Sequence, residues 1–163
     1  MKFGKVPVHT AKGAILAHST RLSGRILKKG HLLTEDDIIF FTEEGMNQIT
    51  VARLGSNDIP ENEAATLITR ILAGENVKAT NAFTGRCNLI SKKNGLLLFD
   101  TEKLNTINLI DESVTIATSE QYGLIAAGQL VATIKIIPFA ITKSVLNLVT
   151  KAIAEEPLIS IAP

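Results

Sequence analysis

Hydrophobic positions along the chain follow two different spacings. Runs that alternate in polarity or are rich in β-branched residues are typical of strands, whereas apolar residues three and four positions apart indicate one face of a helix. We predict strands over residues 13–18, 49–54, 96–99, 114–118 and 129–137. We predict helices over residues 35–44 and 60–74, a third that begins after Asp100 and a fourth that begins at Thr142. Such a pattern is typical of an α+β or mixed α/β fold, with short capped helices packed on a mixed β-sheet.

The ends of two predicted helices carry residues that favour those positions. Thr34 is a good N-cap and is followed by three acidic residues, which the positive end of a helix favours. Gly45 suits the left-handed position that ends the same helix. Asp100 is the expected cap of the third helix. That helix is expected to carry the apolar residues Leu104, Ile107 and Leu109.

The chain length of 163 residues is that of one domain. We expect an N-terminal α/β domain over residues 1–155, either undivided or as two small lobes, 1–75 and 76–155. Residues 157–163 are apolar and bounded by prolines. They are either a tail that packs back on the domain or, as we favour, part of a linker (156–163) to a missing C-terminal domain.

Composition excludes several classes of protein. Hydrophobic residues make up 45% of the chain, which is too much for intrinsic disorder, and no apolar run is long enough for a membrane-spanning helix. The single cysteine, Cys87, cannot form an intrachain disulfide, so a reducing, cytoplasmic location is expected. Residues 1–34 carry seven Lys and Arg and no acid, but the interleaved aromatics typical of nucleic-acid binding are missing. We therefore expect neither nucleic acid nor membrane as a partner.

Sequence motifs for nucleotide binding and catalysis are missing from the chain. It has no phosphate-binding loop, no dinucleotide fingerprint and no nucleophile elbow. Its three histidines are not spaced as metal ligands, so no metal site is expected. An enzyme acting through Cys87 would need a paired base, and no base is placed for it, so we assign no catalytic residue.

A polar cluster within apolar surroundings is the strongest candidate for ligand binding. Thr84, Arg86 and Asn88 place a hydroxyl, a guanidinium and an amide around a glycine. The planar guanidinium suits a phosphate, but a loop whose arginine pairs with a nearby carboxylate is equally compatible with the sequence. Asn108 and Asp111 form a second polar group at a helix-to-strand junction, where Asp111 can also simply bond turn amides.

Lys135 stands within a strongly apolar predicted strand. Its ammonium either extends outward from an edge strand, forms an internal salt bridge, or meets a bound anion. Pro138 favours the edge strand, because proline cannot donate into a central ladder. Arg86 and Lys135 together could neutralise an anionic ligand.

Four stretches in combination resemble the N-terminal region of bacterial molybdopterin-binding proteins of molybdenum cofactor biosynthesis. The stretches are residues 13–19, 83–89, 108–112 and 131–140, and the string Lys-Ile-Ile-Pro-Phe-Ala at 135–140 is the most distinctive. The resemblance implies a cytoplasmic protein that handles a phosphorylated pterin dithiolene, molybdopterin. It also implies C-terminal domains of a parent protein as partners, one of them a nucleotidyltransferase-like, cytidylyltransferase-type domain.

The expected function is that of an accessory domain that assists binding of anionic molybdopterin or its presentation to the fused domain. The chain by itself is not expected to catalyse a reaction, although a full-length parent could be a nucleotidyltransferase. The alternative is a structural or dimerisation module without a small-molecule site. In that case the apolar strands and the last helix would form the interface of a homo-oligomer.

Overall fold

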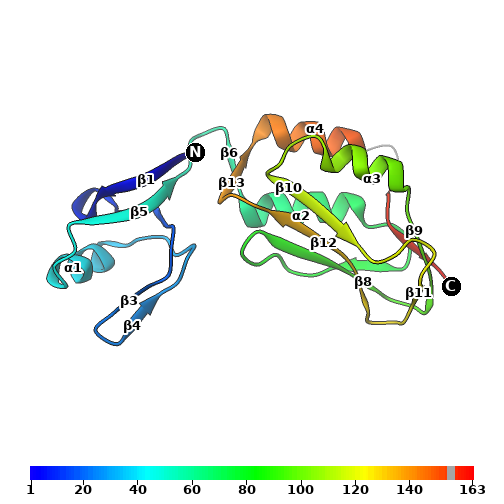
Figure 1. The fold of residues 1–163 in the computed structure, drawn as a ribbon, viewed down its shortest axis with the longest axis horizontal. Helices are drawn as coiled ribbons and strands as arrows, with labels where there is room; N and C mark the ends of the chain where they lie inside the picture. The colour runs from blue at the N-terminus through cyan, green and yellow to red at the C-terminus, as the bar shows by residue number, and fades with distance from the viewer. Residues whose placement is uncertain (154–156) are drawn as a thin grey trace. The chain divides into compact units, whose positions relative to one another are not determined.

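The computed structural model describes residues 1–153 and 157–163, and its chain divides into two units, Met1–Asp58 (unit 1) and Ile59–Pro163 (unit 2). The described residues form four α-helices and several small antiparallel sheets, which confirms the α+β class (Figure 1). The strands do not join into one mixed sheet. The unit boundary lies 17 residues before the 75/76 division considered from the sequence, because the helix over Glu61–Leu72 packs on strands of unit 2.

Unit 1 is built around one central strand. β5 (Gln48–Arg53) pairs on one side with β1 (Lys2–Pro7) and on the other with the two-residue β2 (Ile15–Leu16), so only part of the strand predicted over 13–18 forms. Its other elements are the 3-10 turn η1 (Val8–Thr10), the hairpin of β3 (Thr20–Leu22) with β4 (Arg25–Leu27), and the helix α1 (Glu35–Glu43).

α1 begins with the predicted cap. The Asp37 amide donates to Thr34 Oγ1 at 3.3 Å, and the Asp37 carboxylate accepts from the Thr34 amide at 2.9 Å, which completes a capping box. The same buried carboxylate accepts from Arg25 at 2.9 Å and contacts His31 Nε2 at 2.6 Å. Burial alone would raise the pKa of Asp37, but the hydrogen bonds from Thr34 and His31 outweigh it and lower the pKa to about 2.

Unit 2 contains a four-stranded sheet with one face covered by helix. Its order is β10 (Val114–Thr118), β12 (Leu130–Ile136), β8 (Arg86–Ser91) and β7 (Val77–Ala79). α2 (Glu61–Leu72) contacts β8, β12 and α4 (Lys143–Ile153), whereas α3 (Thr101–Asn108) contacts β10 and α4. Strand residues that face the helices are buried, and the alternate residues face solvent.

A smaller sheet completes unit 2. β9 (Gly95–Leu98) pairs with β11 (Leu124–Ile125) on one side and β14 (Ser160–Ala162) on the other. β13 (Ala140–Thr142) pairs with β6 (Asp58–Pro60), the strand that spans the unit boundary. None of the described helices is both long enough and apolar enough to cross a bilayer.

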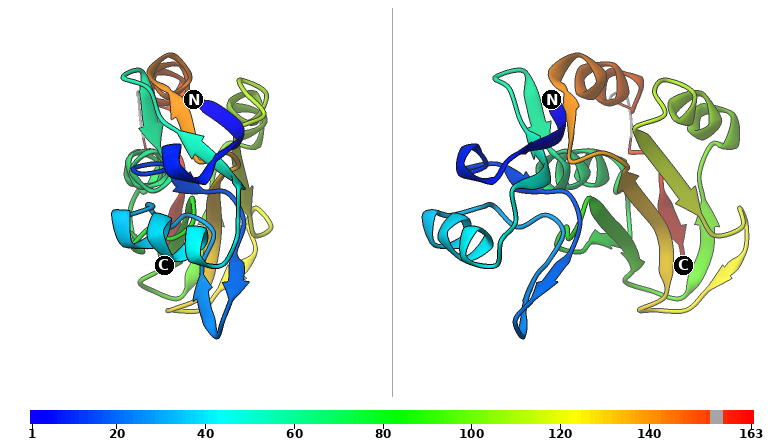
Figure 2. Two further views of the ribbon diagram at one scale, coloured as in Figure 1. Left: turned by 90° about the vertical axis from the view of Figure 1, so that its left-hand side faces the viewer. Right: turned by 60° about the vertical axis from the view of Figure 1, so that its left-hand side comes forward.

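The C-terminal segment packs on unit 2. Ile159 and Ile161 are buried, and β14 lies alongside β9 (Figure 2). Residues 157–163 are therefore a packed part of unit 2, as in the tail alternative, because burying two isoleucines in the core is strongly favourable. The predicted domain end at residue 155 and linker start at residue 156 lie outside the described residues.

The third helix also departs from its prediction at one position. Asp100 Oδ1 accepts from the Lys103 amide at 3.0 Å, and Leu104 and Ile107 are buried, as expected. Leu109 is 85% exposed, because α3 ends at Asn108 and the next residue no longer follows the buried face.

Candidate functional site

A two-residue turn holds the first of the predicted polar residues. Thr84 and Gly85 both have positive φ, 47° and 70°, as the central residues of a type I′ hairpin do. Phe83 and Arg86 close the hairpin through reciprocal backbone hydrogen bonds of 2.8 and 3.0 Å. Arg86, the first residue of β8, therefore has its backbone fixed by the turn.

Gly85 fixes this turn against the rest of unit 2. Its amide donates to Asn62 Oδ1 at 2.9 Å, and its carbonyl accepts from the Ile136 amide at 2.7 Å. A Cβ atom at this position would lie 2.6 Å from the Ile136 carbonyl oxygen and 2.7 Å from Glu61 Oε2. Glycine is thus required by space as well as by conformation, and the turn cannot move independently of β12.

Arg86 and Lys135 lie directly opposite each other on neighbouring strands. Lys135 on β12 has Arg86 on β8 as its register partner on one side and Thr115 on β10 on the other. Directly opposed side chains in an antiparallel sheet have Cβ atoms about 4.5–5.5 Å apart and project from the same face. The two cations from distant segments therefore meet on the solvent-facing side of the sheet.

A second row of polar residues adjoins the first. Thr133 is the register partner of Asn88, and its hydroxyl donates to Asn88 Oδ1 at 2.9 Å. We call the two rows together the polar face; its members are Arg86, Asn88, Thr115, Thr133 and Lys135. Thr133 was missed from the sequence, although its spacing of two from Lys135 places both on one side of a strand.

The contacts of Lys135 distinguish the three explanations for a lysine in an apolar strand: an edge strand, an internal salt bridge and a bound anion. β12 is paired on both sides, so the edge-strand explanation is wrong, and Pro138 lies beyond the end of the strand. The Lys135 ammonium donates to the Thr84 carbonyl oxygen. Within residues 1–153 and 157–163 neither Lys135 nor Arg86 forms an ion pair, so the structure shows no internal salt bridge for either cation.

Asn108 and Asp111 lie apart from the polar face. The Asn108 amide group donates to the Ile116 carbonyl and accepts from the Ile116 amide, at 2.9 and 2.8 Å, and so completes the free edge of β10. Asp111 accepts from the hydroxyl and the amide of Ser113, and both hydrogen bonds lower the pKa of its carboxyl. The structure gives both residues contacts that stabilise the fold, and it brings only Thr84, Arg86, Asn88 and Lys135 together.

Two further kinds of site were considered from the sequence, a catalytic cysteine and a metal site. Cys87 is buried, and its Sγ donates to the Thr80 carbonyl at 3.2 Å. Among the described residues no group of three or more His, Cys, Asp and Glu side chains could hold a metal ion.

Comparison with protein families gives a match in the N-terminal part of the chain. A family model described as a domain of unknown function (DUF8806) matches residues 5–53, which lie within unit 1. No curated protein matches the chain. The matched segment does not include the polar face.

Proposed function

We propose that unit 2 binds the phosphate of an anionic ligand on the polar face, between Arg86 and Lys135. On the resemblance noted above, this ligand is molybdopterin. The chain would then act as an accessory domain in molybdenum cofactor biosynthesis, assisting binding or presentation to a cytidylyltransferase-type domain of a parent protein. A cytoplasmic location belongs to the same proposal.

The register pair of Arg86 and Lys135 is the observation that carries the proposal. Like charges directly opposite on neighbouring strands destabilise a sheet, and in the part of the chain that the structure describes neither of these two side chains forms an ion pair. A bound phosphate would convert this repulsion into charge-assisted hydrogen bonds with both side chains. The guanidinium can engage two oxygens at once, whereas the ammonium acts as a point charge.

Neighbouring groups add to the proposed phosphate site. The Thr115 hydroxyl is on the far side of Lys135 in the same row, and it can donate to a second phosphate oxygen. Thr84 holds the lysine ammonium near Arg86 through its carbonyl. No imidazole, carboxylate or thiol is among the five residues of the polar face, which suits a site that binds without acid–base catalysis.

The alternative is a dimerisation module, and one surface expected to form its interface is the apolar face of the last helix. The last predicted helix was to present an apolar stripe to a second copy. In the structure Leu146, Val149 and Ile153 of that stripe are buried, and α4 packs on α2. Sedimentation equilibrium of the intact chain tests this alternative, since removing residues 142–163 would also remove the packed strand β14.

Calorimetric titration of the 163-residue chain with a phosphorylated pterin tests the proposal. Arg86→Ala and Lys135→Ala should each weaken binding at least about tenfold, as expected when one charge-assisted hydrogen bond is lost. Lys78→Ala is the matched control, because Lys78 is an exposed cation on the same sheet face, paired with Ile90 two strands from Lys135. The dephosphorylated pterin should bind weakly or not at all. Unchanged affinity in both Arg86→Ala and Lys135→Ala would overturn phosphate capture by this pair.

A further inference from the structure

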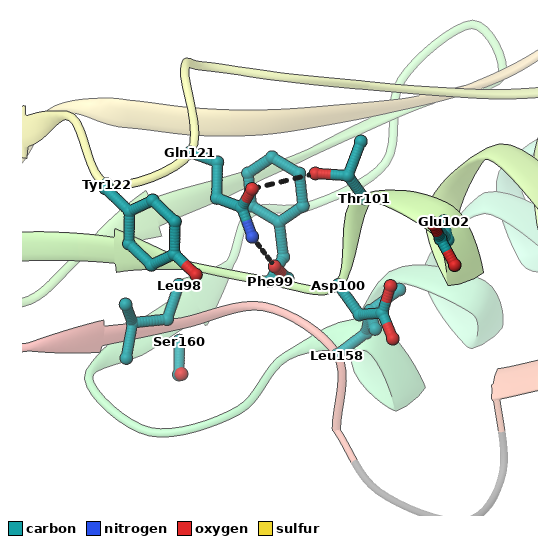
Figure 3. A pocket seen from close by; sticks show the side chains of 9 residues that line it. All are labelled: Leu98, Phe99, Asp100, Thr101, Glu102, Gln121, Tyr122, Leu158 and Ser160. Carbon is teal, nitrogen blue, oxygen red and sulfur yellow. Dashed lines mark hydrogen bonds between the residues drawn. The ribbon is translucent and has the colours of Figure 1, made fainter.

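An open pocket in unit 2 shares no residue with the polar face. It has a volume of about 690 Å³, within the range of small-molecule sites, and lies where β9, the start of α3, β14 and the turn at residues 121–122 meet (Figure 3). Residues that line it include Leu98, Asp100, Glu102, Tyr122, Leu158 and Ser160.

The two ends of this cavity differ in chemistry. Figure 3 shows the ring of Tyr122 and the side chain of Leu98 on one side, and the carboxylates of Asp100 and Glu102 on the other. In the part of the chain that the structure describes, neither carboxylate forms an ion pair. Asp100 is the N-cap of α3, and Glu102 lies in its first turn.

The wall between the two ends is held in place by Gln121. Its amide group accepts from the Thr101 hydroxyl at 3.0 Å and donates to the Phe99 carbonyl. Because these contacts join the turn to the start of α3, the aromatic and acidic ends keep their separation. The cavity is therefore preformed, which favours binding of a small ligand.

The apolar end continues along the outer face of the small sheet. Leu96 and Leu98 are two residues apart on β9, and Leu96 is the register partner of Leu124, which is 85% exposed. Tyr122 is 64% exposed beside them. An apolar chain that leaves the cavity past Leu98 would thus have further apolar surface to cover.

We propose that this cavity binds a small organic cation: an amine whose ammonium lies at Asp100 and Glu102 and whose apolar portion lies against Leu98 and Tyr122. The carboxylates supply the charge-assisted acceptors, the tyrosine ring supplies an apolar wall, and Leu96 and Leu124 extend the apolar contact. The site is independent of phosphate binding on the polar face.

A series of primary n-alkylamines from propylamine to hexylamine tests the assignment, observed through the amide resonances of the intact chain at 150 mM salt. The amines should shift the amides of residues 98–102 and 121–122 saturably. Affinity should rise about two- to fourfold per methylene, because a fully buried methylene contributes about 0.8 kcal/mol and this surface is partly open. The alcohols and carboxylates of equal length should bind at least about fivefold more weakly.

Three variants separate the two ends of the site. Asp100→Asn keeps the helix cap, since asparagine caps as well as aspartate, and with Glu102→Gln it should weaken amine binding at least about fivefold each. Tyr122→Gly removes the ring at a residue whose φ is +62°, a conformation that glycine adopts freely, so the melting temperature should not fall while amine binding weakens. Glu120→Gln is the control for a neighbouring acid outside the cavity lining.

The proposal is overturned by any of three results. These are the absence of saturable shifts at the cavity, equal binding of amines and alcohols of the same length, and an equal loss of affinity in Glu120→Gln and Glu102→Gln.

Discussion

Arg86 on β8 and Lys135 on β12 are register partners, so two cations 49 positions apart in sequence project side by side from one face of the sheet. The hairpin at Thr84–Gly85 sets the start of β8, and the Gly85 carbonyl bonds to the Ile136 amide next to Lys135. One turn thus positions both side chains. This arrangement is unfavourable for the unliganded sheet and favourable for an anion.

Removing one of the two charges should therefore stabilise the unliganded fold. Arg86→Gln relieves the repulsion with Lys135, and we expect a gain of about 0.2–1 kcal/mol in the free energy of unfolding at low salt. The gain should shrink at 1 M salt, where the Debye length is about 3 Å. Urea denaturation at both salt concentrations measures it. Lys78→Gln should leave stability within about 0.5 kcal/mol of the parent chain, and a loss of stability in Arg86→Gln would contradict the repulsion.

Gly85→Ala should destabilise unit 2 by more than its backbone conformation alone explains. Gly85 and Gly128 both have positive φ, 70° and 86°, but only at Gly85 would a Cβ meet other atoms, the nearest at 2.6 Å. We expect a loss of about 1 kcal/mol for Gly128→Ala and at least about 2–3 kcal/mol for Gly85→Ala, measured by denaturation. Equal losses would show that the turn is not confined by Ile136 and Glu61.

The stability of unit 1 should fall in acid, because the stabilising contribution of the Asp37 carboxylate is lost when it is protonated. Its pKa of about 2 in the fold is below the ordinary 3.8, so the folded chain binds this proton less readily than the unfolded chain. The stabilisation, on the order of 2 kcal/mol, is present above about pH 4 and is lost as the pH falls toward 2. Amide hydrogen exchange within α1 as a function of pH reports it.

Asp37→Asn should abolish that pH dependence and destabilise unit 1 at pH 7 by a similar amount. The exposed neighbour Asp36 offers the matched variant, Asp36→Asn, which should change stability by less than about 0.5 kcal/mol. Acid sensitivity that persists in Asp37→Asn would assign it to other groups.

The C-terminal strand should contribute to the stability of unit 2. Ile161 on β14 is buried, so Ile161→Ala is expected to lower the free energy of unfolding by about 2–4 kcal/mol. Leu109→Ala deletes a similar volume at an exposed position and should stay within about 0.5 kcal/mol. If both variants had equally small effects, β14 would not be part of the core.

Features set by neighbouring residues could be predicted from the sequence. The caps at Thr34 and Asp100 depend on groups three residues away, and both form as expected. The helix predicted over residues 60–74 likewise follows from local spacing, and α2 forms over Glu61–Leu72. The end of α3 was harder to predict from the sequence. Leu109 was expected on the apolar face of this helix, but the helix ends at Asn108 and Leu109 is exposed.

Features set by distant segments could not be predicted. The pairing of Lys135 with Arg86 and Thr115 depends on strand order, and periodicity carries no information about which strands are neighbours. The apolar run at the C-terminus is compatible with a linker until β9 is known to present an open edge to it. Asn108 was predicted to bind a ligand because the sequence does not show its structural role. Its hydrogen bonds to Ile116 form only when β10 packs beside α3.

A double-mutant cycle measured by calorimetry tests the central claim most directly. The intact chain, Arg86→Ala, Lys135→Ala and the double variant are each titrated with the phosphorylated pterin. If one phosphate contacts both side chains, the two losses should not add, with a coupling of about 0.5–3 kcal/mol. Strictly additive losses, or no loss in any variant, would contradict a shared phosphate site between Arg86 and Lys135.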